Sequence, residues 1–191
     1  EQEFSEVTQM HFIPKLAFAI AAALAGPALA EADPTAIIRI GSLYEPQNLD
    51  NTAGAGQGIN EAFNDNVYEA LFRLNDDGSV VPVLAATHTV SDDGLAHTFT
   101  LRDGVKFHSG DPLTAADVKY SIERVTAEAS KSSRKKSLST IAGIETPDDK
   151  TVVVKLASRS ISLPYNLSYV WIVNDAATDI TATEDGTGPY V

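Results

Sequence analysis

The sequence predicts an α/β fold in which short strands and hairpins pack with a few helices. Residues 97–101 alternate polar and apolar side chains, which is typical of a half-buried strand. Val118, Ile122 and Val125 recur at helical spacing and give their segment one apolar face. Residues 141–156 contain two apolar stretches around a Pro-Asp-Asp-Lys turn, which indicates a hairpin. The chain is long enough for these elements to bury one core of ordinary size.

The strand at residues 97–101 is expected to continue into a hairpin. Phe99 and Leu101 fall on the same face of this strand, the one we expect to be buried. Asp103-Gly104 supplies a turn, because Gly adopts positive φ readily and Asp bonds its own backbone. Val105 and Phe107 resume the alternation beyond the turn. We therefore predict a hairpin across Asp103-Gly104.

Two helices are predicted from capping and periodicity. Thr114 precedes Asp117 by three residues, a capping-box spacing that marks the start of the helix carrying Val118. A second helix is predicted from Ile59 onward. Its apolar residues recur on one helical face at Phe63, Val67, Ala70 and Leu71.

Turn residues divide the amino-terminal half of the chain. Residues 36–43 alternate and predict a strand, which Tyr44-Glu45-Pro46 ends because Pro cannot continue a central ladder. Residues 51–58 form a Gly-rich loop that lacks the residue order of a phosphate-binding loop. Asn75-Asp76-Asp77-Gly78 predicts the turn of a short hairpin.

The amino terminus predicts export. Lys15 precedes an apolar stretch at residues 16–24, and Ala28-Leu29-Ala30 gives a small-x-small cleavage site before Glu31. The apolar stretch is far shorter than the ~20 residues that span a bilayer. A cleaved signal peptide is therefore favoured over a membrane anchor.

These signals divide the chain into three parts. Residues 1–9 are acidic, which opposes the positive start of a signal peptide, so we interpret them as an upstream extension before Met10. Residues 10–30 are then the signal peptide, cleaved after Ala30, and residues 31–191 are the mature chain. The sequence contains no cysteine, so we expect neither a disulfide nor a lipid anchor. We predict a free periplasmic protein.

Charge and motifs exclude several classes of function. A net charge of −12 argues against nucleic-acid binding, and we interpret the basic residues within 129–136 as a solvated loop. The sequence has no GxSxG, no HExxH and no cysteine nucleophile, so we predict neither an enzyme nor a cofactor. His97 and His108 would approach each other across the predicted hairpin. Without a fixed carboxylate they predict no metal site.

Residues 99–125 carry the most specific pattern in the chain. They read FTLRDGVKFHSGDPLTAADVKYSIERV. This ordered run resembles the signature segment of the extracytoplasmic solute-binding proteins of peptide-type ABC importers. Residues 67–71 and the closing GTGPY at residues 186–190 resemble further segments of that family. The resemblance extends from about Ala36 to Val191.

The resemblance implies a fold and a function. The fold is that of a type II periplasmic binding protein, represented by its first lobe only, with the second lobe and the carboxyl-terminal return absent. The function is capture of peptides of the dipeptide or oligopeptide class for ABC permease subunits in the inner membrane. Nickel chelate, haem or an opine are alternative ligands, and a periplasmic sensory or interaction module is the alternative function. In peptide-binding relatives the groups that hold the peptide termini generally lie in the later portion, so none is assigned here.

The candidate ligand-binding residues are aromatic or lie in a loop. Tyr165, Tyr169 and Trp171 form a dense aromatic stretch, in a region where the family's chain returns toward the ligand cleft. Aromatic rings there would suit peptide side chains or a planar chelate. We expect Tyr169 and Trp171 to contact ligand together with Tyr44 and Glu45. Packing in the core or an interface is the alternative for the two aromatic residues.

Overall fold

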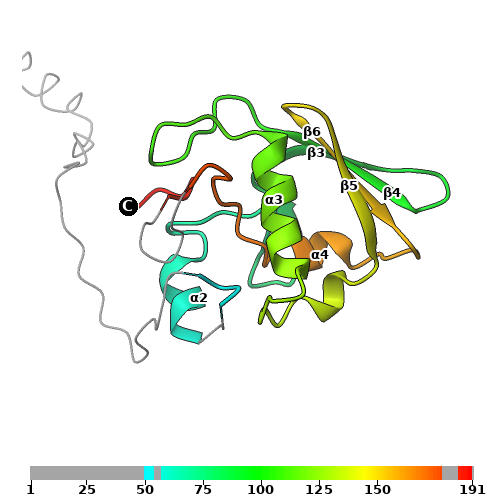
Figure 1. The fold of residues 1–191 in the computed structure, drawn as a ribbon, viewed down its shortest axis with the longest axis horizontal. Coiled ribbons are helices and arrows are strands. Elements are labelled where there is room, and N and C mark those ends of the chain that lie inside the picture. The colour runs from blue at the N-terminus through cyan, green and yellow to red at the C-terminus, as the bar shows by residue number, and fades with distance from the viewer. Residues whose placement is uncertain (1–49, 54–56, 178–184, 191) are drawn as a thin grey trace, which may run out of the picture. The chain divides into compact units, whose positions relative to one another are not determined.

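The computed structural model describes residues 50–53, 57–177 and 185–190 (Figure 1). In chain order the elements are α2 (Gln57–Phe63), β1 (Phe72–Leu74), β2 (Val80–Pro82), β3 (Ala85–Val90), β4 (Ala96–Leu101), α3 (Ala115–Thr126), the 3-10 helix η1 (Lys136–Leu138), β5 (Ile141–Asp148), β6 (Thr151–Leu156) and α4 (Leu163–Leu167). The predicted signal peptide, the strand expected at residues 36–43, and Tyr44 and Glu45 lie outside the described residues. No helix in the described part is long and apolar enough to cross a membrane.

A four-stranded antiparallel sheet with the order β3-β4-β6-β5 carries most of the core. β5 and β6 form the hairpin that was predicted for residues 141–156. Phe99 on β4 lies opposite His88 of β3 and Val152 of β6, and its side chain is fully buried. Helix α3 packs against β5 and β6 (Figure 1). The predicted α/β architecture is confirmed.

Helix α3 begins and packs as its sequence predicts. The carboxylate of Asp117 accepts hydrogen bonds from the backbone N–H and the hydroxyl of Thr114, at 2.8 and 2.7 Å. This capping arrangement fixes the first turn of the helix. Val118, Ile122 and Val125 are 0–2% exposed and face the sheet side of the core.

The hairpin predicted across Asp103-Gly104 is wrong. Strand β4 pairs with β3 on one edge and β6 on the other, so neither edge remains for residues 105–107. That segment instead folds back on itself: the N–H of Phe107 bonds the carbonyl of Asp111, and Gly110 adopts a φ of 96°. Phe107 is still buried, because the returning loop places it in the core.

The helix predicted from Ile59 is shorter than its apolar pattern suggests. Helix α2 ends at Phe63, whose carbonyl accepts the N–H groups of three successive residues, 66–68. Asp65 adopts a φ of 59° within this turn, which stops the helix. The chain then leads into β1, and the predicted β1–β2 hairpin turns at residues 75–78 with Gly78 at a φ of 84°.

The closing GTGPY segment lies directly against the turn after α2. The N–H of Gly188 bonds the carbonyl of Val67 at 2.9 Å, and the N–H of Tyr190 bonds that of Asn66 at 3.0 Å. A Cβ atom on Gly186 would stand 1.8 Å from the Val67 carbonyl oxygen, and one on Gly188 would stand 2.4 Å from that of Asn66. This backbone contact therefore requires glycine at both positions.

Candidate functional site

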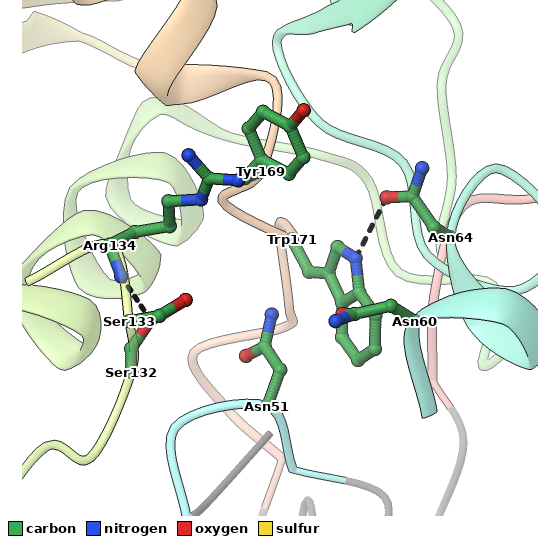
Figure 2. A pocket seen from close by; sticks show the side chains of 8 residues that line it. All are labelled: Asn51, Asn60, Asn64, Ser132, Ser133, Arg134, Tyr169 and Trp171. Carbon is green, nitrogen blue, oxygen red and sulfur yellow. Dashed lines mark hydrogen bonds between the residues drawn. The ribbon is translucent and has the colours of Figure 1, made fainter. Parts of the chain in front are cut away.

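A pocket of about 280 Å³ opens between segments that are far apart in the sequence (Figure 2). The segments come from the residues before α2, from α2 and the turn after it, from the loop before η1, and from the chain after α4. The eight described residues that line it are Asn51, Asn60, Asn64, Ser132, Ser133, Arg134, Tyr169 and Trp171. Two aromatic rings, five neutral polar side chains and one cation make up this lining.

Trp171 is held rigidly at the pocket. Its ring stacks on Tyr68 with centroids 5.1 Å apart and planes 13° apart. Its indole N–H donates to the side-chain oxygen of Asn64 at 3.0 Å, as Figure 2 shows. The residue is only 4% exposed, and it belongs to a core cluster with Ile59 and Val67. Trp171 therefore packs in a core and also lines the pocket, so the two interpretations of this residue are compatible.

Tyr169 forms the second aromatic surface of the pocket together with Arg134. The guanidinium carbon of Arg134 lies 3.5 Å from the Tyr169 ring centroid and 5.9 Å from that of Tyr165. The two phenolic oxygens are 3.4 Å apart. This hydrogen bond raises the pKa of Tyr169 and lowers the pKa of Tyr165. Arg134 thus stacks on an aromatic face and lies within hydrogen-bonding reach of both tyrosine hydroxyls, while its guanidinium carries further N–H donors.

Asn51 is positioned by an ion pair on its neighbour. Arg124 of α3 donates to the Asp50 carboxylate at 2.7 Å and also contacts the Thr52 hydroxyl at 3.3 Å. The carbonyl of Thr52 accepts the backbone N–H of Lys131 at 2.9 Å. Residues 50–52 are therefore fixed to α3 and to the loop that follows it. Asn51, 8% exposed, is held between these attachments at the wall of the pocket.

Sequence reasoning missed most of this lining. The loop at residues 129–136 is irregular up to η1, as predicted, but Ser132, Ser133 and Arg134 line the pocket rather than serving only as a solvated segment. Nothing in a short basic stretch signals which of its cations stacks on a distant ring. Tyr169 and Trp171, which the sequence did single out, lie on the same pocket.

The histidines pair differently from the arrangement considered in the sequence. His88 Nε2 and His97 Nδ1 lie 3.0 Å apart, because β3 and β4 pair side by side. His108 does not approach His97; its Nε2 lies 2.7 Å from the carbonyl of Gly188. Burial lowers the pKa of both His88 and His97. Within the described ranges no group of three or more His, Cys, Asp or Glu side chains could hold a metal ion.

Comparison with solved structures defines the class of this fold. The solute receptor AgaA from A. tumefaciens R10, solved with agropinic acid, is 36% identical with a TM-score of 0.70 over 76% of this chain and 30% of AgaA. The oligopeptide-binding protein AppA from Bacillus subtilis, solved with a nonapeptide, has a TM-score of 0.69 at 23% identity, over 78% of this chain and 32% of AppA. The fold is that of a type II periplasmic binding protein, matched over part of its length.

Comparison of sequences identifies the family. Residues 79–191 match the middle region of the bacterial extracellular solute-binding proteins, family 5. The glutathione-binding protein GsiB of Salmonella typhi is 34% identical over 174 residues, which cover 86% of this chain and 32% of GsiB. The chain belongs to family 5 of the bacterial extracellular solute-binding proteins. It spans about a third of the length of the curated relatives that it matches.

Proposed function

We propose that this chain captures peptides in the periplasm for import by an ABC transporter, with the pocket at Trp171 as one wall of the ligand site. The composition of the pocket lining carries the proposal. Two aromatic rings stand beside three side-chain amides and two hydroxyls. Apolar surfaces with a few polar groups are typical of ligand pockets, and amides can bond both the N–H and the C=O of a peptide.

The candidate residues take different roles in this proposal. Trp171 and Tyr169 would contact the apolar side chains of a ligand, because both residues line the pocket. Asn51 and Asn60 would bond its backbone. Tyr44 and Glu45 remain proposed ligand contacts on the basis of the sequence alone. A volume of about 280 Å³ is small among ligand pockets, which favours a dipeptide-sized portion of the ligand.

Affinity is the first test of this proposal. On the family resemblance, ligands lie between two lobes, and the described pocket supplies one wall. Micromolar binding corresponds to ~8 kcal/mol, of which one wall gives less than half, so the 191-residue chain should bind peptides more weakly than ~1 mM. Calorimetry with dipeptides and tripeptides measures this directly. Tight, saturable binding would show that one wall holds a complete site.

The location of binding is the second test. Nuclear magnetic resonance follows millimolar binding, so peptides should shift the signals of Trp171, Tyr169 and Asn51 at the pocket. The signals of the β1–β2 hairpin serve as the internal control, because it contributes no residue to the pocket lining. Shifts confined to regions other than the pocket, or no shifts at all, would contradict the proposal.

A small organic acid is the second candidate ligand. The observation that favours it is the likeness to AgaA, which was solved with agropinic acid. The same titrations should therefore include agropinic acid, with a nickel–histidine complex as a further comparison. Preference for the acid over every peptide would replace the peptide proposal with this one.

Export is proposed from the sequence of the amino terminus. If residues 10–30 are a signal peptide, the periplasmic product begins at Glu31. Amino-terminal sequencing of protein released from the periplasm tests this. A periplasmic product that begins at Glu1 would overturn both the cleavage site and the start at Met10.

A further inference from the structure

We propose that Arg134 binds a carboxylate, so that the solute held in this pocket carries a free carboxylate group. The proposal rests on the proposed function of the pocket as a ligand site and goes further by assigning the chemical class of the ligand. It starts from the position of the guanidinium, which lies over the Tyr169 ring at the pocket wall (Figure 2). Stacking covers one face of the guanidinium. Its planar edge carries five N–H donors, so donors remain for an acceptor beside the two tyrosine hydroxyls.

Arg134 also lacks an ion-pair partner among the described residues. Within the described residues the ion pairs involve Lys119, Arg124, Lys150 and Lys155, and none of them involves Arg134. None of the eight residues that line the pocket is acidic. This is notable in a chain with 26 acidic side chains and a net charge of −12. A half-buried cation beside a cavity whose described lining holds no acid is stabilised when an anionic ligand enters.

Asn51 offers a neutral polar group to the same pocket. The residue is 8% exposed and lines the pocket, yet its side-chain amide has no hydrogen-bond partner among the described residues. Asn64 differs, because its amide is occupied by Trp171 and Asp65. The amide atoms of Asn51 are not among the fully buried side-chain atoms without a partner, so they reach the cavity, where a ligand amide or hydroxyl can bond them. The pocket therefore offers one charged position and at least one neutral polar position.

These positions together define a ligand. A carboxylate at Arg134 would receive two parallel N–H···O bonds, which a planar guanidinium is shaped to give. An amide or hydroxyl would reach Asn51, and an apolar or planar part would lie on Trp171. A cationic group has no acidic partner in the described lining. The class is a small carboxylate-bearing solute with amide or hydroxyl groups, such as a peptide with a free carboxyl end.

The test compares acids with their neutral amides. A panel of acetylated dipeptides, each prepared with a free carboxyl end and as the carboxamide, is titrated into the whole chain and followed by nuclear magnetic resonance. The acids should bind at least about tenfold more tightly than the carboxamides, because hydrogen bonds to charged groups are stronger than those between neutral groups. The preference should shrink at high salt.

Two charge-matched variants decide the role of Arg134. Arg134→Gln should remove the preference for the acid, so that each acid and its carboxamide bind with similar affinity. Lys136→Gln removes the same charge from an exposed position in the same stretch and should keep the preference. Melting temperatures of both variants verify folding. Persistence of the preference in Arg134→Gln, or equal loss in both variants, would overturn the assignment. If neither acids nor amides shift pocket signals in the unmodified chain, the proposed function fails, and the assignment fails with it.

Discussion

Arg124 and Asp50 form an ion pair of 2.7 Å between α3 and a segment 74 residues earlier in the chain. Both side chains are about 15% exposed, so the pair is largely shielded from solvent. The contact fixes residues 50–52 and, with them, Asn51 at the pocket wall. Arg124 on helix α3 thereby helps to position one residue of the candidate site without lining the pocket itself.

Removing this ion pair should affect both stability and the pocket. Arg124→Gln should lower the free energy of unfolding by about 1–3 kcal/mol, because a shielded carboxylate loses its partner. The Asn51 resonance should also broaden or move. Lys155→Gln is the control, since Lys155 pairs with Glu145 on the exposed surface of the sheet and should cost less than about 1 kcal/mol. Denaturant titration measures both changes, and equal losses would contradict the role given to Arg124.

The sheet core makes a sharper contrast between two neighbouring residues. Phe99 is fully buried between β3 and β6, so Phe99→Ala should cost roughly 3–5 kcal/mol. Arg102 is exposed, with one long contact of 3.4 Å to the carbonyl of Pro82, so Arg102→Ala should cost under ~0.5 kcal/mol. Thermal or denaturant unfolding checks the pair. Similar melting shifts would contradict the burial of Phe99 and the exposure of Arg102.

The backbone contact at the closing segment predicts a strict glycine requirement. Gly188→Ala places a Cβ atom 2.4 Å from the carbonyl oxygen of Asn66, so we expect a loss of about 1–3 kcal/mol or more. Gly143→Ala is the matched control, because a Cβ atom on Gly143 meets nothing within 4 Å. The control variant should be neutral or slightly stabilised. A tolerated Gly188→Ala would refute the close approach of residues 66 and 188.

Acid should weaken the fold through the histidine pair. Burial lowers the pKa of His88 and His97 below the ordinary 6.5, and the neighbouring His97 lowers that of His88 further. The unfolded chain therefore binds protons more readily. The contribution of the two neutral histidines to the free energy of unfolding is complete above about pH 6.5. It is lost as the pH falls through their lower pKa values in the folded chain.

A double variant isolates this effect. Between about pH 7.5 and about pH 5, the stability of the unmodified chain should fall more steeply than that of His88→Gln/His97→Gln. Asp92 and Arg159 line a cavity together with the two histidines. Both charged residues are present in the unmodified chain and in the double variant, so their effects on the pH dependence of stability cancel in the comparison. Urea midpoints across this range provide the measurement. Identical slopes would assign the acid sensitivity to other groups.

Local sequence patterns correctly predicted the structural elements that depend only on residues close by in the sequence. The cap between Thr114 and Asp117 needs only three residues, and the turns at 75–78 and 147–150 need four. The alternating sequence pattern gave a wrong prediction where strand pairing depends on residues that are distant in the sequence. Val105 and Phe107 alternate like a strand, but both edges of β4 are occupied by segments that the local pattern does not identify.

The candidate site likewise contains some residues that the sequence could identify and others that it could not. Tyr169 and Trp171 could be selected because aromatic residues are few and cluster there. Arg134 could not, because its role depends on a ring 35 positions later in a different segment. Asn51 owes its position to the ion pair between Asp50 and Arg124, which no spacing in the sequence reveals. Polar pocket residues are therefore a product of tertiary packing rather than of a motif.

Trp171 also gives the chain an intrinsic optical reporter. It is the only tryptophan, it stacks on Tyr68 and it lines the pocket, so indole fluorescence originates at the candidate site alone. A ligand that displaces water from the indole should shift the emission to shorter wavelength. Excitation at the red edge of the absorption band, where tyrosine does not absorb, would follow this change without a label. Solutes can therefore be screened on the unmodified chain in a plate reader.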